Sequence, residues 1–399
     1  SGDRATVGGG FNNDAISQFS TLSGGEDNTT SGAHATVGGG DTNTASGTQS
    51  TVGGGFSNTA SGTQSTVGGG GGNTASGLRS FVGGGDTNTA SNTYATVGGG
   101  DTNTASGNRA TVSGGESNNA LGGYSNVSGG IVNTASGFIS TVGGGENNTA
   151  SNTNATVGGG VSNTASGIRS TVSGGQDNTA STGHGTIGGG QNNTATDTHT
   201  TVGGGSGNDA TNDYSTISGG QNNTASGLRS FVGGGLGNNA SGTLSVVAGG
   251  ESNTAGGILS TASGYQTSTS RWGQFAQASG RFVSDGDAQF SRYVVRTATT
   301  DATANVELFL DGTGGSNRIT IPEDTVFSFH IYITSIQQSG NNAKSSETVG
   351  LIRRQNGGNA TIVGQHTDGN KTFNDGGFNP SYTISADTSN QALKIDVTG

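Results

Sequence analysis

Cysteine and methionine are absent from this chain of 399 residues, and only two residues are proline. Without cysteine, the chain can form neither a disulfide framework nor a cysteine-based metal site. Charged residues make up 10% and hydrophobic residues 27% of the sequence, whereas 81 residues are glycine. No apolar run approaches the roughly 18 residues of a membrane-spanning helix, so we expect no membrane insertion.

The formal net charge of −11 is distributed unevenly along the chain. Residues 1–260 hold five arginines, no lysine and 14 acidic residues, whereas residues 261–399 hold ten basic and 12 acidic residues. Nucleic-acid binding requires clustered Lys and Arg, and we therefore expect no nucleic-acid partner. The low apolar content is typical of disorder, but a strictly periodic pattern favours order.

One phrase of 15 residues, TVGGGFSNTASGTQS at positions 51–65, recurs along most of the chain. Its opening returns every 15 residues from Thr6 to Thr261, with no insertion or deletion. A fixed short period predicts a solenoid in which each repeat forms one coil stacked on the previous one.

Within a coil numbered from the Thr of TVGGG, position 2 is Val, Ile or Leu in nearly every copy. Position 10 is Ala in nearly every copy, with Thr30 as the exception. Small polar residues alternate around both positions, which predicts two short strands per coil with one apolar side chain each pointing inward. Position 12 is mostly Gly, Asn or Asp, which predicts a positive φ there and local strain at Ser17 and Thr182.

Position 8 is Asn in every coil from Asn13 to Asn253. Stacked Asn side chains about 4.8 Å apart can form an axial hydrogen-bond ladder, or each can cap only its own turn. Both interpretations give these residues a structural role, and the first five are Asn13, Asn28, Asn43, Asn58 and Asn73.

Each coil buries little apolar surface, because Val at position 2 and Ala at position 10 are its only regular apolar residues. Ordering the backbone of a whole coil costs far more conformational entropy than two such side chains return by burial. Glycine lets backbones approach closely. We therefore expect several chains to share one core.

The pattern S-T-V-G-G-G-x-x-N-T-A-S-G-x-x resembles the head repeats of trimeric autotransporter adhesins (the YadA-like head), which also occur in phage tail fibres. Those repeats are often one residue shorter and carry S-x-A-x-G phrases, to which residues 260–264 and 276–280 are closer. The resemblance extends from the start of the chain to Gly280. It implies a left-handed parallel β-roll, a homotrimer and a role in adhesion.

After residue 264 the period loosens, and the sequence predicts a neck at 265–290 with Trp272 and three phenylalanines. We expect this aromatic cluster to cap the open end of the solenoid of residues 1–264. From residue 291 the pattern changes to longer strands with alternating apolar residues, as in Phe327, Phe329, Ile331 and Ile333.

Residues 291–399 therefore read as an antiparallel β-sandwich of about eight strands with a jelly-roll-like topology. The stretches SRYVVRTATTDATANVELFLDG and ITIPEDTVFSFHIYITS resemble a distal module of phage tail fibres and tailspike-like proteins. The predicted fold is all-β throughout, with the solenoid first and the sandwich last.

No motif indicates catalysis, a cofactor or a metal. Position 6 holds Asp41, Asp86 and Asp101, but also Phe56 and Gly71, so a regular calcium column is not expected. The five histidines lack ligand spacing, and the glycine runs lack the Lys and Ser/Thr of a phosphate loop.

Paired acids are the chain's nearest approach to a catalytic pattern. Glu323–Asp324 and the pair Asp368 and Asp375 could in principle hydrolyse a polysaccharide. Adjacent acids in turns are usually solvated, so we expect that the protein is not an enzyme.

We therefore expect an extracellular or virion-surface fibre that attaches to a cell-surface glycan or receptor, most simply a phage tail fibre. Its rod would measure about 80 Å at ~4.8 Å per coil. A passenger fragment of a bacterial trimeric surface adhesin is an alternative, and so is an ice-binding solenoid, because positions 9 and 11 form Thr-x-Ser columns.

The repeats duplicate freely and offer no unique site, so we expect loops on the last domain to contact the receptor. The candidate contact residues are Gln338, Asn341, Asn342, Lys344, His366, Asp368, Lys371, Phe373 and Phe378.

Overall fold

The structure, a computed structural model, describes residues 2–298, 306–312, 314–337, 343–373 and 380–398. The chain forms two compact units, Ser1–Gly237 and Asn238–Gly399. Every regular element in the described ranges is a β-strand. None of these residues form a helix that is long and apolar enough to span a membrane.

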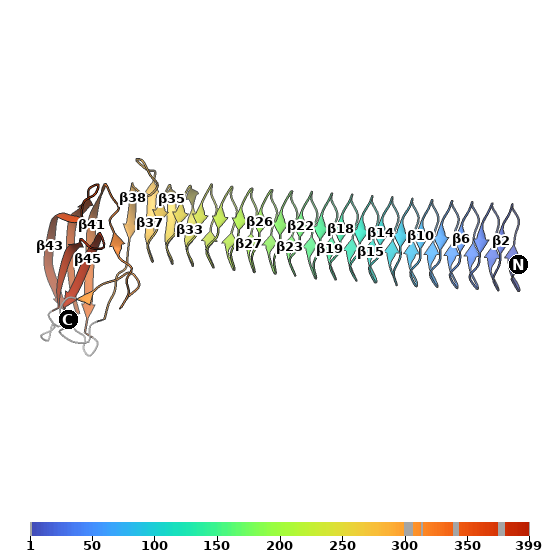
Figure 1. Ribbon diagram of the computed structural model, residues 1–399, viewed down its shortest axis with the longest axis horizontal. Coiled ribbons are helices and arrows are strands. Elements are labelled where there is room, and N and C mark those ends of the chain that lie inside the picture. Colours follow the sequence, from blue (N-terminus) through green and yellow to red (C-terminus); the bar gives the residue numbers. More distant parts are fainter. Residues whose placement is uncertain (1, 299–305, 313, 338–342, 374–379, 399) are drawn as a thin grey trace. The chain divides into compact units, whose positions relative to one another are not determined.

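In the first unit, each coil contributes two very short strands, as the alternating pattern predicts, and Figure 1 shows these strands stacked one behind another from blue to green. The odd-numbered strands hold coil positions 1 and 2: β1 Thr6–Val7, β3 Thr21–Leu22, β5 Thr36–Val37, β7 Thr51–Val52, β9 Thr66–Val67, β11 Phe81–Val82, β13 Thr96–Val97, β15 Thr111–Val112, β17 Asn126–Val127, β19 Thr141–Val142, β21 Thr156–Val157, β23 Thr171–Val172, β25 Thr186–Ile187, β27 Thr201–Val202, β29 Thr216–Ile217 and β31 Phe231–Val232. The even-numbered strands hold positions 9 and 10: β2 Asp14–Ala15, β4 Thr29–Thr30, β6 Thr44–Ala45, β8 Thr59–Ala60, β10 Thr74–Ala75, β12 Thr89–Ala90, β14 Thr104–Ala105, β16 Asn119–Ala120, β18 Thr134–Ala135, β20 Thr149–Ala150, β22 Thr164–Ala165, β24 Thr179–Ala180, β26 Thr194–Ala195, β28 Asp209–Ala210 and β30 Thr224–Ala225.

Each strand pairs in parallel with the equivalent strand of the neighbouring coil, so that residues at the same coil position lie side by side. Thr51 lies beside Thr66 in the odd sheet, and Thr59 lies beside Thr74 in the even sheet. Position 6 adds a third column of single parallel bridges, for example between Phe56 and Gly71. The predicted parallel β-solenoid, with one sequence repeat per coil, is therefore confirmed.

The core of a coil consists of four small side chains, as in Val52, Asn58, Ala60 and Ser65, all of which are fully buried. Each lies at an inward position of the pleat, whereas the Thr at positions 1 and 9 is half-buried. At the exceptional Thr30 the hydroxyl is buried without a hydrogen-bond partner. The small core explains why Ala recurs at position 10.

The Gly found at position 12 in most coils is explained by a close approach and not by its backbone conformation. A Cβ on Gly62 would lie 2.0 Å from the carbonyl oxygen of Gly77 in the next coil, and position-12 residues do not have a positive φ. The prediction of a positive φ at position 12, with strain at Ser17 and Thr182, is therefore wrong.

Among the non-glycine residues of the coils, the left-handed conformation instead occurs at positions 7 and 14, in the variable columns. Arg79 and Thr87, for example, both have a φ of 55°. Because inter-coil hydrogen bonds hold each turn, large and even β-branched residues adopt a conformation that usually selects glycine.

The second unit begins with further coils, whose strands are β32 Asn239–Ala240, β33 Val246–Glu251, β34 Thr254–Ala255, β35 Thr261–Tyr265, β36 Ser268–Thr269 and β37 Phe275–Ser279. The last coil is shorter by a single residue, because Thr261 lies beside Phe275. Strand β38, Gln289–Arg292, then pairs antiparallel to β37 and ends the parallel stacking.

The remaining strands form two antiparallel sheets. The first contains β39 Val306–Glu307, β40 Ile319–Thr320, β44 Ser381–Asp387 and β45 Ala392–Thr398, and the second contains β41 Thr325–Ile336, β42 Ala343–Arg354 and β43 Thr361–Phe373. Residues of both sheets share one core around Ile321, Ile352, Ala360 and Leu393. The described residues thus form the expected antiparallel sandwich with seven strands, and β41 alternates between inward and outward side chains as predicted.

Candidate functional site

The Asn of position 8 joins each coil to both of its neighbours. In Asn103, Nδ2 donates to the carbonyl oxygen of Gly99 in its own coil at 3.0 Å and to that of Gly115 in the next coil at 2.8 Å. Its Oδ1 accepts a hydrogen bond from the backbone N–H of Asn118 at 2.9 Å. The column therefore combines the two expected arrangements, an axial ladder and a turn cap, and both are structural.

The predicted ladder residues follow the same pattern at the start of the chain. The N–H of Asn28 donates to Oδ1 of Asn13, and the series continues through Asn43, Asn58 and Asn73 at 2.9–3.1 Å. Asn28 and its successors are fully buried. A buried amide with all of its partners present stabilises one conformation strongly.

The neck does not cap the solenoid with its aromatic side chains. Phe275, Phe282 and Phe290 are 44%, 86% and 68% exposed, and the prediction of an aromatic cap is therefore wrong. Backbone pairing and a polar side chain form the cap: β38 pairs with β37, and Gln289 donates to the carbonyl oxygen of Ser268 at 2.7 Å and accepts from its N–H at 2.9 Å. The backbone groups at the end of a solenoid need hydrogen-bond partners, which amides supply and phenyl rings cannot.

Four of the candidate receptor-contact residues, Gln338, Asn341, Asn342 and Phe378, lie outside the described residues. Four others, His366, Asp368, Lys371 and Phe373, lie in strand β43, which runs over residues 361–373. The prediction that His366 and Asp368 lie in a loop is wrong, because β43 pairs with β42 up to Asp368 and again from Lys371, with a register shift between them, despite the turn-like sequence.

Lys344 belongs to strand β42 and is 5% exposed. Its Nζ donates to the carbonyl oxygen of Pro380 at 2.9 Å. A buried ammonium group that bonds to the backbone supports the fold and cannot contact a receptor directly.

The acidic pair considered for catalysis has structural partners. Glu323 forms an ion pair with Arg354 at 2.8 Å, and Asp324 accepts a hydrogen bond from the backbone N–H of Asn356 at 2.7 Å. Both acids thus fasten the start of β41 to the end of β42. Asp375 lies outside the described residues.

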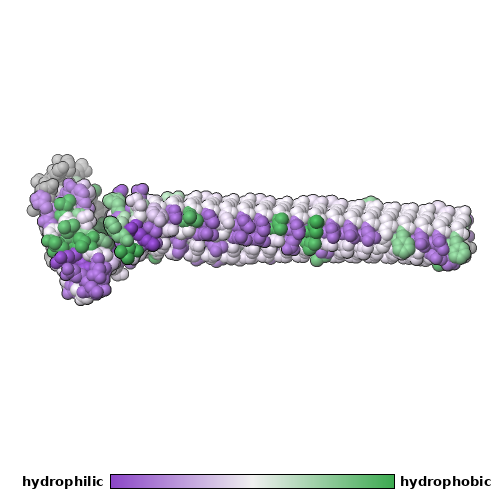
Figure 2. All heavy atoms as spheres, turned by 90° about the horizontal axis from the view of Figure 1, so that it is seen from above, coloured by the Kyte–Doolittle hydropathy of each residue, from purple (hydrophilic) through white to green (hydrophobic). Residues whose placement is uncertain are grey.

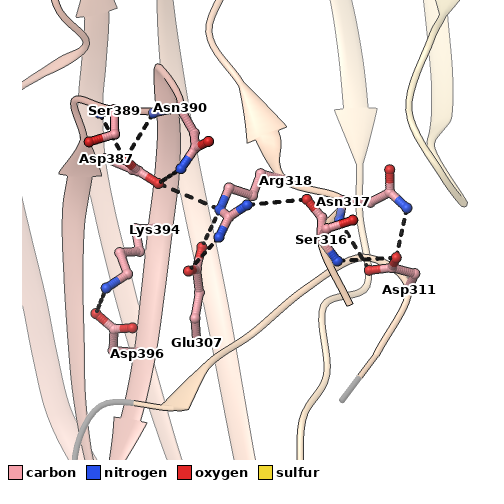
Figure 3. Close-up of polar contacts among 10 residues, drawn as sticks. All are labelled: Glu307, Asp311, Ser316, Asn317, Arg318, Asp387, Ser389, Asn390, Lys394 and Asp396. Atoms are coloured by element: carbon pink, nitrogen blue, oxygen red, sulfur yellow. Dashed lines mark hydrogen bonds and ion pairs between the residues drawn. The ribbon is translucent and has the colours of Figure 1, made fainter. Parts of the chain in front are cut away.

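A polar cluster around Arg318 lies between β39 and the turn that joins β44 to β45 (Figure 3). Nε of Arg318 donates to Oε1 of Glu307 at 2.8 Å and Nη2 donates to Oε2 at 3.1 Å, a bidentate pair. Asp387 lies 3.5 Å from Nε, and the guanidinium group stacks on the ring of Phe309 with 4.7 Å to its centroid. The hydrogen bonds to Glu307 raise the pKa of Arg318 above its ordinary value.

The carboxylates near this cluster are held in the charged form. Hydrogen bonds from the side chain and backbone of Asn390 lower the pKa of Asp387 below its ordinary value. Burial raises the pKa of Asp311, but hydrogen bonds from Asn317 and Ser316 outweigh burial and lower it overall. Both acids act as acceptors that shape turns.

A cavity of about 310 Å³ lies beside this cluster in the second unit. Its wall consists of one indole ring, two guanidinium groups and several amide and hydroxyl groups, from Ser270, Arg271, Trp272, Leu310, Ser316, Asn317, Arg318, Thr320 and Asn390. Arg271 is held in place by hydrogen bonds to Thr320 and to the hydroxyl of Tyr293. An aromatic ring with convergent amides and hydroxyls suits a polyhydroxylated ligand.

Sequence reasoning missed this cavity because it joins residues that lie far apart in the chain, from Ser270 to Asn390. The available signal was the single Trp of the chain, Trp272, next to Arg271. A lone aromatic residue beside a basic one is a weak signal without the partners that the fold supplies.

Within the described part of the chain, no group of three or more His, Asp or Glu side chains could hold a metal ion. A scan against protein-family models finds no match, and a search of curated proteins finds no similar sequence.

Proposed function

We propose that this β-solenoid repeat protein is an adhesive fibre of the phage tail-fibre or receptor-binding type. In this proposal the solenoid is a spacer, and the C-terminal sandwich region binds a cell-surface glycan. The supporting observation is the uninterrupted repetition of one coil, because each coil is fastened to the next by the same bonds from Thr6 onward. A structure of this kind gives length and stiffness without a unique site.

The spacer role rests on the number of bonds that cross each coil boundary. Between the coils that contain Asn103 and Asn118, the backbone N–H groups of Thr104 and Asp101 donate to the next coil at 2.8 and 2.9 Å, in addition to the Asn ladder. Such bonds lie along the axis and resist both bending and stretching.

The homotrimer is part of this proposal, and the exposed neck supports it. Phe282, Val283 and Phe290 of the neck, and Val294 just after it, are each more than 60% exposed. Phe290 and Val294 line one groove together with Phe275, and apolar side chains gathered on an exposed surface mark an interaction site. We place the contact between copies at this neck surface, and the number of three follows from the resemblance of the repeats.

The receptor ligand in this proposal is a saccharide that enters the cavity beside Trp272. Sugars stack their C–H faces on aromatic rings, and their hydroxyls bond to amides such as those of Asn317 and Asn390. The two positive charges of Arg271 and Arg318 balance the two negative charges of Glu307 and Asp387, which favours a neutral sugar at this point.

The test uses the full-length chain on an array of microbial and eukaryotic surface glycans. Replacement of Trp272→Ala should abolish binding to the glycans that the wild type retains, whereas Trp272→Phe should preserve most of it. The matched control Phe56→Ala removes an exposed aromatic side chain from the repeats and should leave binding unchanged. Equal binding by wild type and Trp272→Ala would contradict the cavity, and no glycan binding at all would contradict the receptor role.

Ice binding remains a second candidate because of the regular hydroxyl array. Thr59, Thr74 and Thr89 lie side by side in parallel register on one sheet, and Ser61 and Ser76 follow them on the same outer surface. A thermal hysteresis measurement on the full-length protein decides this candidate, since a value of zero excludes it.

A further inference from the structure

The basic residues of the first unit occupy a single position of the coil. All five of its arginines lie at position 14, and so do its three histidines and its three tyrosines: Arg4, Arg79, Arg109, Arg169, Arg229, His34, His184, His199, Tyr94, Tyr124 and Tyr214. These arginines look scattered along the sequence, but their numbers differ by multiples of 15. The coil therefore brings them onto one line.

Positions 13 and 14 form one edge of the solenoid, which we call the basic edge. Successive strands alternate between the two sheets, so the two turns of a coil lie at opposite edges. Positions 6 and 7 form the other, acidic edge, which holds Glu26, Asp27, Asp41, Asp86, Asp101, Glu116, Glu146 and Asp177. Figure 2 looks onto one edge, where strongly coloured side chains form a single line beside the pale surface of small residues.

The side chains of the basic edge stack on one another along the axis. The guanidinium groups of Arg79 and Arg109 lie on opposite sides of Tyr94, at 5.5 and 5.3 Å from its ring centroid, and Arg109 also lies 5.2 Å from that of Tyr124. Nη1 of Arg79 donates to the hydroxyl of Tyr94 at 2.5 Å. Alternate cation–π contacts fix the orientation of these side chains.

A second stack covers the next part of the edge. His184 and His199 stack at 4.5 Å between centroids, His199 and Tyr214 at 4.9 Å, and Arg229 lies 5.7 Å from the ring of Tyr214. Because ring faces are covered by neighbours, the groups left for solvent are guanidinium N–H groups, phenol hydroxyls and imidazole edges.

The cations of this edge lack carboxylate partners. Among the residues of the first unit that the structure describes, no arginine forms an ion pair, and all five are exposed. Coils repeat at ~4.8 Å, so Arg79 and Arg109 are two coils apart, and Arg109, Arg169 and Arg229 follow at intervals of four coils. The edge, which also carries Asp3 and Asp213 at position 13, thus presents widely spaced arginines with hydroxyl donors between them.

We propose that the basic edge binds an extended acidic polysaccharide. Carboxylate or sulfate groups would pair with the guanidinium groups, and sugar hydroxyls would bond to the tyrosine hydroxyls and imidazole edges between them. Each contact is weak at an exposed site, but several contacts along one polymer multiply the affinity.

A nucleic acid fits this edge less well. Its phosphates are dense and require closely spaced cations, whereas the first unit is acidic overall. Its bases stack on free ring faces, which here are covered by neighbouring side chains. The polysaccharide site is separate from the cavity beside Trp272 and stands whether or not that cavity binds a receptor.

The test measures binding of the full-length protein to immobilised alginate, with dextran sulfate as a second acidic probe and neutral dextran as the control polymer. The wild type should bind both acidic polymers, more weakly at higher salt, and should not bind dextran. A variant with Arg79→Gln, Arg109→Gln, Arg169→Gln and Arg229→Gln should bind at least about tenfold more weakly. All four side chains are exposed, and an unchanged circular dichroism spectrum would verify the fold.

The matched control has the same number of changes on the other edge: Asp41→Asn, Asp86→Asn, Asp101→Asn and Glu116→Gln. It should bind alginate at least as strongly as the wild type, and Trp272→Ala should bind it equally well. Equal alginate binding by the arginine variant, or no binding of either acidic polymer by the wild type, would overturn the proposal. Stronger binding to single-stranded oligothymidylate than to alginate would overturn the ligand class.

Discussion

Oδ1 of Asn253 accepts a hydrogen bond from the backbone N–H of Thr267 at 2.9 Å, over a separation of 14 residues. The preceding rung, from Asn238 to Asn253, spans 15. Thr267 is too short to continue the ladder, and its hydroxyl instead donates to the carbonyl oxygen of Ser263 and accepts from the N–H of Ala278 at 2.9 Å. Thr267 thus ends the axial Asn ladder at the point where the coil shortens from 15 to 14 residues.

We expect Asn133→Ala to destabilise the solenoid. The change removes hydrogen bonds from Nδ2 to the carbonyl oxygens of Gly129 and Gly145, and leaves the N–H of Asn148 without its acceptor. Unsatisfied buried groups should lower the free energy of unfolding by about 2–4 kcal/mol. Urea unfolding followed by circular dichroism measures this, and Asn108→Ala, at an exposed position without a positive φ, is the control. Equal stability of the two variants would show that the ladder contributes little.

We expect two adjacent glycines to differ sharply in their response to alanine. Gly55 has a φ of 93°, and a Cβ there would lie 2.1 Å from the carbonyl oxygen of Gly70, so Gly55→Ala should cost at least about 2 kcal/mol. A Cβ on Gly54 would have Gly39 as its nearest neighbour at 3.9 Å, so Gly54→Ala should change stability by less than about 0.5 kcal/mol. Thermal unfolding of the two variants measures the difference, and a reversed order would contradict the coil geometry.

We expect the exposed neck to control assembly. Phe290→Asp, alone or with Phe282→Ser, should reduce the mass in solution from three chains to one chain of 38.8 kDa, because a buried charge opposes association. Light scattering measures the mass, and Phe56→Ser in the repeats is the control with a similarly exposed ring. A wild type with the mass of one chain would refute the trimer itself.

We expect Asp387 to make the stability of the sandwich depend on pH. Hydrogen bonds from Asn390 lower its folded pKa below the ordinary 3.8, so its contribution is complete above that value and is lost as the pH falls through the folded pKa. Asp387→Asn should therefore be less stable than the wild type at pH 6, and the difference should shrink towards pH 2.5. Urea unfolding at several pH values measures this, and a difference that does not vary with pH would exclude the mechanism.

We expect chelators to leave the fold unchanged. Within the described residues, acidic and imidazole side chains do not gather in groups that could hold a metal ion. The melting temperature should be the same with and without EDTA, and a clear decrease on EDTA addition would reveal a metal-dependent part of the structure.

Much of the solenoid could be predicted from sequence because its period is visible in single residues. The spacing of Val52 and Val67, and of Ala60 and Ala75, correctly predicted which residues form strands and which face inward. The same period placed all arginines of the first unit at one coil position. Their arrangement is therefore present in the sequence, although a count of charges alone does not reveal it.

The candidate site could not be predicted in this way. The cavity beside Trp272 brings residues from the last coil next to residues from Leu310 to Asn390, and only the packing of the neck against the sandwich decides which groups meet. The sequence predicted that Lys344 lies in a receptor-contact loop. In the structure Lys344 belongs to a paired strand, and its buried Nζ donates to the carbonyl oxygen of Pro380. Turn-like residues near Gly369 did not end a strand, because pairing with a long neighbouring strand outweighs local preference.

By itself, the sequence determined the repeat, the two strands of each coil, the inward Val, Ala and Asn, and the change to antiparallel strands near residue 291, since each depends on a local alternation or a fixed period. The tertiary structure alone decided why position 12 is mostly Gly and at which positions non-glycine residues are left-handed. Those features depend on the 2.0 Å approach that a Cβ on Gly62 would make to Gly77 and on hydrogen bonds that hold Arg79 at a φ of 55°. Both arise from contacts between coils, which a single repeat does not contain.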